Sequence, residues 1–181
     1  MTPPVGAPKT LVLTALFAAT AAAGGYLLMA IPNVELLTAI LFLAGHTLGV
    51  WFGMMAALVA TFLYFGLNPQ GGLFLPLLTA QLLGVILAPI IGGMVSGISL
   101  QGWRLALLLG TLGVITTVWY DLLTTLAFPL YAGFDRRGII ATLLLGIPFS
   151  AVHIASNAAI FALILPPLMR LVARHQLKPA A

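Results

Sequence analysis

The side chains in this sequence that could do chemistry lie inside apolar segments. Asp121 is the only acidic residue deep within such a segment, and Thr124 shares its face at helical spacing, with Tyr120 beside them. His153 and Asn157, four residues apart in the last long apolar segment, also share a face. An aspartate and a histidine can exchange a proton, hydrogen-bond a small molecule, or join two helices. The residues alone leave these roles open.

The composition defines the kind of element that must position these groups. The chain is 62% hydrophobic and only 6% charged, with a mean hydropathy of +1.19. These values predict a polytopic, all-α membrane protein. The sequence has no cysteine, which excludes disulfides and thiolate metal sites. We expect no cofactor and no metal, and the net charge of +4 does not indicate nucleic-acid binding.

Breaks in hydropathy divide the chain into six expected transmembrane helices within a single domain, residues 1–181. We expect the first apolar segment to be a retained helix and not a signal peptide. Pro129 to Gly138 is predicted to be a charged loop, and Pro148 to separate a short helical piece at 139–145 from the last helix. The expected helices are approximately 9–29, 34–48, 50–66, 76–97, 103–128 and 148–171.

The basic residues indicate the orientation of these helices. With six crossings, one side of the membrane holds five basic residues: Lys9, Arg104, Arg170, Arg174 and Lys178. The other side holds Arg136 and Arg137. Because cytoplasmic loops carry the excess of Lys and Arg, both termini are predicted to be cytoplasmic.

The polar residues then fall at one depth, in the outer half of the membrane. Ionisable groups are costly in hydrocarbon, so such a cluster predicts a water-accessible cavity for a small molecule. Asn33 and Glu35 belong to this level, although helix capping is the favoured role for both. The candidate substrate-binding residues are Asn68, Gln81, Trp119, Tyr120, Asp121, His153 and Asn157.

The first apolar segment has a strip of small residues. Ala15 and Ala19 are spaced four apart, as are Ala18 and Ala22, and such spacing lets a second helix approach closely. The partner could be another protein or a neighbouring helix of the same chain. Internal packing is the simpler of the two explanations.

Three stretches of the chain resemble a known family. They are the Ala-rich first helix, the segment from Pro32-Asn33-Val34-Glu35 through Gly45 and Gly49 to Asn68-Pro69, and the segment from Gly146-Ile147-Pro148 to His153. Together they resemble an S component, the substrate-binding membrane subunit of an energy-coupling factor (ECF) vitamin transporter. The last stretch is similar to the Pro-Phe-Asn-Leu-Ile-Lys motif of riboflavin S components, but His153 stands at the Lys position and Ser150 at the Asn position. This difference argues against assigning riboflavin.

The resemblance implies a fold, partners and a location. It implies six helices with cytoplasmic termini in a prokaryotic cell (inner) membrane, and a vitamin site near the outer surface. It also implies that Ala15 and Ala19 dock on a transmembrane T subunit, and that two ATPase subunits complete an importer. The chain has no phosphate-binding GxxxxGK[ST] motif of its own, so any ATP hydrolysis would come from those partners.

An alternative function is an intramembrane enzyme in which Asp121 and His153 form an acid–base pair. Binding is favoured because no nucleophile or metal-ligand set accompanies the pair in the sequence. A pure scaffold would explain the alanine strip but not the polar cluster.

Overall fold

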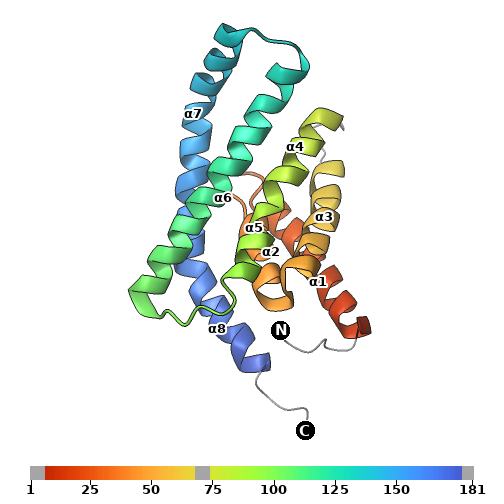
Figure 1. Cartoon of the computed structure of the whole chain (residues 1–181), viewed down its shortest axis with the longest axis vertical. Coiled ribbons are helices and arrows are strands. Elements are labelled where there is room, and N and C mark those ends of the chain that lie inside the picture. Colours follow the sequence, from red (N-terminus) through yellow and green to blue (C-terminus); the bar gives the residue numbers. More distant parts are fainter. Residues whose placement is uncertain (1–6, 68–73, 177–181) are drawn as a thin grey trace.

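The chain folds into a bundle of helices, described here from a computed structural model (Figure 1). The structure describes residues 7–67 and 74–176, and within these ranges all regular elements are helical. The elements are α1 (Ala7–Leu27), α2 (Leu37–Leu48), α3 (Val50–Gly66), α4 (Leu75–Val85), α5 (Leu87–Met94), α6 (Gly102–Tyr131), α7 (Arg136–Ala159), a π-helical turn (Ile160–Ile164) and α8 (Leu165–Gln176).

The all-α prediction is confirmed for the described residues, and four helical stretches among them are long and apolar enough to cross a membrane. They are Pro8–Leu27, Leu75–Met94, Gly102–Tyr131 and Arg136–Ala173. Two shorter apolar helices, α2 and α3, have 12 and 17 residues. At about 1.5 Å per residue, α2 is about 18 Å long, less than the roughly 30 Å of a hydrocarbon core. The structure therefore supports a membrane protein without establishing six crossings.

Two boundaries that were predicted at prolines are wrong. Pro129 lies inside α6, and α7 runs without interruption through Pro148, so no separate piece ends at Leu145. Asp135 caps α7 by accepting a hydrogen bond from the backbone N–H of Gly138 at 2.8 Å, which starts the helix inside the predicted loop. A proline removes one backbone N–H, a local cost that apolar helices tolerate. The π-helical turn just before Pro166 marks a change of axis direction between α7 and α8 (Figure 1).

Close backbone contacts bury α2 in the centre of the bundle. A Cβ atom at Gly45 would overlap the carbonyl group of Pro89 in α5, and one at Gly92 would overlap the carbonyl oxygen of Phe42. Gly53 of α3 approaches Gly45 equally closely, because its Cβ would lie 2.6 Å from the Gly45 Cα. Glycine at these positions thus lets α2, α3 and α5 pack backbone to backbone.

A second part of the core attaches the C-terminal helices to α2. Phe42 and Phe161 are both fully buried, and their rings meet edge to face with centroids 5.3 Å apart. Leu109 of α6 and Leu165 of α8 belong to the same cluster. This contact holds α6, α7 and α8 in a fixed position relative to α2, which matters for the site described below.

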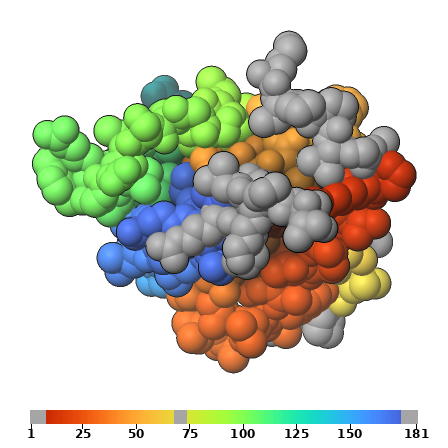
Figure 2. All heavy atoms as spheres, turned by 90° about the horizontal axis from the view of Figure 1, so that it is seen from below, coloured from red at the N-terminus to blue at the C-terminus, as the bar shows by residue number. Residues whose placement is uncertain are grey.

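The basic residues divide between the two ends of the bundle. One end of the bundle in Figure 1 holds the start of α1, the start of α6, and the whole of α8. These elements carry Lys9, Arg104 and Arg170, respectively. The turn from α6 to α7, which carries Arg136 and Arg137, lies at the other end. An end-on view shows α8 between the start of α6 and α1 (Figure 2).

The hairpin formed by α6 and α7 extends beyond the other helices (Figure 1). Aromatic contacts stabilise the far end of the hairpin. The ring centroids of Phe128 and Phe134 lie 5.9 Å apart. Phe74, at the start of α4, contacts the hairpin, with its ring centroid 5.1 Å from that of Tyr131. Large apolar side chains are nevertheless exposed on the hairpin, including Leu145, which is 76% exposed. Such a surface suits contact with lipid.

Candidate functional site

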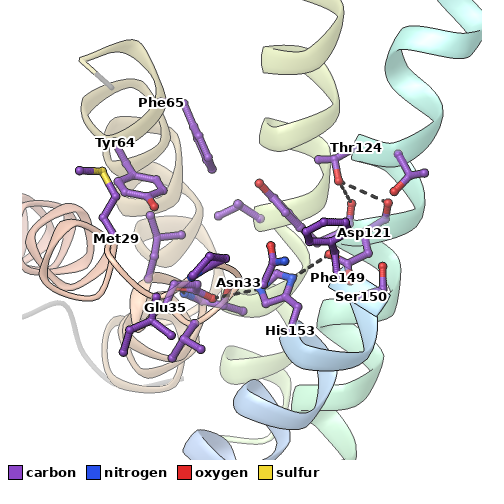
Figure 3. Close-up of a pocket in the computed structure, with 18 of the residues that line it drawn as sticks. Met29, Asn33, Glu35, Tyr64, Phe65, Asp121, Thr124, Phe149, Ser150 and His153 are labelled. Carbon is purple, nitrogen blue, oxygen red and sulfur yellow. Dashed lines mark hydrogen bonds and ion pairs between the residues drawn. The ribbon is translucent and has the colours of Figure 1, made fainter. Parts of the chain in front are cut away.

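A cavity of about 590 Å³ lies between the connection from α1 to α2, the end of α3, and helices α6 and α7. Figure 3 shows Met29, Tyr64 and Phe65 on one wall, opposite Asp121, Thr124 and Ser150. The lining residues are Met29, Ile31, Pro32, Asn33, Val34, Glu35, Leu37, Thr38, Tyr64, Phe65, Val85, Tyr120, Asp121, Thr124, Thr125, Gly146, Phe149, Ser150 and His153.

Three ionisable side chains from three parts of the chain converge at this cavity. His153 Nδ1 lies 2.7 Å from Asp121 Oδ1, at hydrogen-bond distance. Its other ring nitrogen, Nε2, lies 3.8 Å from Glu35 Oε1, which is longer than a hydrogen bond. His153 thus stands between two carboxylates (Figure 3). An ionised aspartate can only accept, so the hydrogen bond places a proton on Nδ1.

Glu35 has both a capping role and a place in the site. One carboxylate oxygen, Oε2, accepts a hydrogen bond from the backbone N–H of Thr38 at 2.8 Å, in the first turn of α2. The other oxygen, Oε1, accepts a hydrogen bond from the Asn157 side chain at 3.2 Å. Hydrogen bonds accepted by a carboxylate favour its ionised form.

The connection between α1 and α2 is held against α7. Asn33 adopts a left-handed backbone conformation with φ 58°, which asparagine tolerates better than most residues. Its carbonyl oxygen accepts a hydrogen bond from the Ser156 hydroxyl at 3.0 Å. Together with the bond from Asn157 to Glu35, this contact fixes the floor of the cavity to α7.

Aromatic rings form much of the remaining wall. Tyr120 meets the His153 ring edge to face at 5.8 Å and stacks on Phe65 at 6.5 Å. Tyr64 contacts Phe65 at 4.7 Å. Gly84 of α4 makes room for this arrangement, because a Cβ atom there would lie 2.7 Å from the Tyr120 ring. The cavity therefore combines a charged floor with apolar, flat sides.

The structure brings only part of the predicted set to the cavity. Tyr120, Asp121 and His153 line it. Asn157 is fully buried behind the lining, where it also donates to Thr117 Oγ1 at 3.0 Å. Gln81 and Trp119 are not among the lining residues, and the Trp119 indole donates to the backbone oxygen of Leu83 at 3.0 Å. Asn68 lies outside the described residues.

Sequence reasoning underestimated the connection before α2 and the end of α3. Glu35 and Asn33 were expected to act as caps, and the capping contact of Glu35 is present, but both residues also line the cavity. Tyr64 and Phe65 were not singled out at all. Their position at the end of an apolar helix, at the depth of the polar cluster, is the signal that could have found them.

Several buried polar atoms in the site have no hydrogen-bond partner within the described part of the chain. They include Asp121 Oδ2, His153 Nε2 and Asn157 Oδ1. A buried donor or acceptor without a partner costs about 1–3 kcal/mol, so a ligand group that bonded to these atoms would gain affinity. Among the described residues, no group of three or more His, Cys, Asp or Glu side chains is arranged to hold a metal ion.

Comparisons with protein families, with curated proteins and with solved structures find no match to this chain. Within the described residues, the fold and cavity define an all-helical protein with four helices long and apolar enough to cross a membrane, and with a partly polar cavity.

Proposed function

We propose that the chain is the substrate-binding membrane subunit of an ATP-driven importer of the ECF type, which captures a vitamin or related micronutrient. The observation that carries this proposal is the cavity of about 590 Å³ with ionisable groups on its floor, inside an otherwise apolar bundle. Its volume lies in the range typical of small-molecule sites, roughly 300–1,000 Å³. Ionisable groups inside a membrane-spanning bundle are costly in free energy, so they usually mark a functional site.

The exposed face of α1 supports a partner in the same membrane. Ala18 and Ala22 are buried, so that pair packs inside the bundle, whereas Ala15 and Ala19 are exposed. Small exposed side chains allow a helix of another subunit to approach closely. In the proposal that subunit is the T component, and two ATPase subunits complete the importer.

The proposal also includes a topology. Six crossings would be made by α1, α2 with the connection before it, α3, α4 with α5, α6, and α7 with α8. Both termini would be cytoplasmic in a prokaryotic cell membrane, and the cavity would open toward the outer face. The distribution of Lys9, Arg104 and Arg170 against Arg136 and Arg137 supports this orientation.

Native mass spectrometry of the purified protein tests the binding function. We expect a small molecule to co-purify with the unaltered chain and to be lost from Thr124→Trp, which fills the cavity. The matched control is Thr111→Trp, an exposed position on the same helix, which should keep the molecule. If neither the unaltered chain nor the control ever carries a small molecule, after growth in rich medium, the binding function is wrong.

The hydrogen-bond distance between Asp121 and His153 supports one other function, an intramembrane enzyme that uses the two residues as an acid–base pair. Within the described residues, however, His153 Nε2 has no hydrogen-bond partner, and so activates no hydroxyl group. A co-purified molecule that is chemically changed in the unaltered chain but unchanged in His153→Ala would favour the enzyme.

A further inference from the structure

We infer that the cavity takes an organic cation, a small molecule with a positively charged N–H or quaternary nitrogen group on a flat, largely apolar body. This inference rests on the proposed binding function and adds the chemical class of the ligand. It comes from the charge of the cavity, its unpaired atoms and its aromatic walls.

The charge of the lining residues is negative in any protonation state of the histidine. The lining contains the two carboxylates of Glu35 and Asp121, whereas its only basic group is the His153 imidazole. With a neutral imidazole the group carries two negative charges, and with a protonated one it carries one. None of the five Lys and Arg side chains that the structure describes is among the lining residues, and by sequence residues 68–73 contain no charged side chain.

Apolar surroundings strengthen the interaction of this negative charge with a ligand. Coulomb interactions are several times stronger in a protein interior than in water, so an anion entering beside Glu35 and Asp121 would be repelled and a cation attracted. A helix N-terminus could otherwise attract an anion, and α2 begins at the cavity. That position is already taken, because the Glu35 carboxylate accepts the Thr38 N–H at 2.8 Å.

The unpaired atoms indicate which groups the ligand brings. Asp121 Oδ2 is a buried acceptor without a partner, next to the Oδ1 that is paired with His153. Asp121 itself lines the cavity, and its side chain is 14% exposed. An N–H donor with a positive charge is the strongest partner for such an atom.

The walls suit the body of such a molecule. Tyr64 and Phe65 lie on the wall opposite Asp121 (Figure 3), and Tyr120 and Phe149 also line the cavity. Aromatic faces carry partial negative charge, so they attract cations as well as flat rings. An anionic vitamin would find neither a lysine or arginine side chain nor a free helix N-terminus in the described cavity.

Retention of pooled compounds by the purified chain tests this inference. Three pools of aromatic compounds are matched in size and ring type: amines and quaternary ammonium compounds, alcohols, and carboxylates. Tryptamine, tryptophol and indole-3-acetate are one matched set. Each pool is incubated with the protein at neutral pH, and the retained compounds are identified by mass spectrometry. We expect retention from the cationic pool alone.

Two substitutions test the role of the carboxylates. Asp121→Asn should weaken binding of the retained cation by about tenfold or more. Asp135→Asn, at the α7 cap outside the cavity, should leave the affinity unchanged. Should Asp121→Asn fail to fold, as judged by a thermal melt, Glu35→Gln provides the same comparison.

The possible outcomes separate this inference from the proposed function. Retention of neutral or anionic compounds that Thr124→Trp abolishes would overturn the cation assignment and leave the binding function in place. Full affinity for the cation in both Asp121→Asn and Glu35→Gln would also overturn it. Retention from none of the three pools would overturn the cation assignment. The binding function would then be decided separately, by whether a small molecule co-purifies with the unaltered chain.

Discussion

His153 Nδ1 lies 2.7 Å from Asp121 Oδ1, and this contact joins α7 to α6 at the floor of the cavity. Its geometry directs the second ring nitrogen of His153 toward Glu35, on the opposite side of the floor. Because Asp121 fixes the ring, a substitution at either residue changes the orientation of the other. Substitutions around the cavity are therefore expected to change both the ligand affinity and the stability of the bundle. The balance between the two effects should differ from one position to another.

Removing the imidazole should weaken ligand binding. We expect His153→Ala to lower the affinity for the co-purified molecule by roughly 5- to 150-fold, equivalent to about 1–3 kcal/mol for one lost hydrogen bond in a dry site. Calorimetric titration measures the affinity, with a thermal melt as the folding control. Unchanged affinity with a lowered melting temperature would show that His153 only joins the two helices.

Asn157 should affect stability more than affinity, since it is buried behind the cavity wall. Asn157→Ala removes the donor that serves both Glu35 Oε1 and Thr117 Oγ1, at 3.2 and 3.0 Å. We expect the free energy of unfolding to fall by about 1–3 kcal/mol. The measurement is denaturant or thermal unfolding in detergent. Thr111→Ala is the control, because this exposed hydroxyl bonds only to Leu107 in its own helix; an equal loss there would contradict the prediction.

The close packing around α2 predicts that a methyl group added at a glycine destabilises the fold at some positions and not at others. Gly45→Ala should destabilise the fold by about 1–3 kcal/mol, because the new methyl group overlaps backbone atoms of Pro89, which cannot move without separating α2 from α5. Gly66→Ala adds the same group to α3 where no atom lies within 4 Å, and should be neutral or slightly stabilising. Melting temperatures of the two variants, compared in one detergent, decide the matter; equal temperatures would refute the packing account.

The two alanine pairs of α1 should separate assembly from folding. Ala15→Trp, on the exposed face, should block co-purification with the proposed T subunit while ligand binding and melting temperature persist. Ala18→Trp, at a position that is 1% exposed, should instead lower the melting temperature sharply. Co-purification from cells that express all subunits provides the readout. Normal assembly of Ala15→Trp would remove this face from the proposed interface.

The orientation can be tested directly. A reporter that is active only in the cytoplasm should be active when fused after Ala181, because the start of α6 and α8 carry more basic residues than the turn from α6 to α7. Fusion of the same reporter at Gly133, in that turn, should be inactive. Activity in the reverse pattern would place the cavity toward the cytoplasm.

Hydropathy was sufficient to predict the helical class, because long apolar segments satisfy their backbone hydrogen bonds best as helices. It failed where local signals compete. Pro148 indicated a break, yet Asp135 caps the chain thirteen residues earlier and the helix continues through the proline. The connection before α2 was expected to be helical from about Val34, but the left-handed Asn33 and the turn after it delay the helix to Leu37.

The site was only partly predictable for a related reason. Asp121, His153 and Asn157 stood out because charged and amide groups are rare in apolar segments. Which of them face the cavity depends on helix rotation and on contacts between distant segments, such as Ser156 with Asn33. Single-sequence periodicity does not contain that information. Glu35 illustrates the limit, since its capping role was predictable and its contact with α7 was not.

The unequal lengths of the helices bear on the choice of membrane. α1 has 21 residues and α6 has 30, so α6 is longer by about 14 Å at about 1.5 Å per residue. A bilayer whose thickness matches α1 would leave the apolar tip of the α6–α7 hairpin in the headgroup region or in water, unless the hairpin tilts. Hydrophobic mismatch of this kind costs a fraction of a kcal/mol per Å and is relieved by tilting or by local thickening of lipid. In a membrane, the thickness of the host bilayer would therefore set how far the hairpin formed by α6 and α7 tilts.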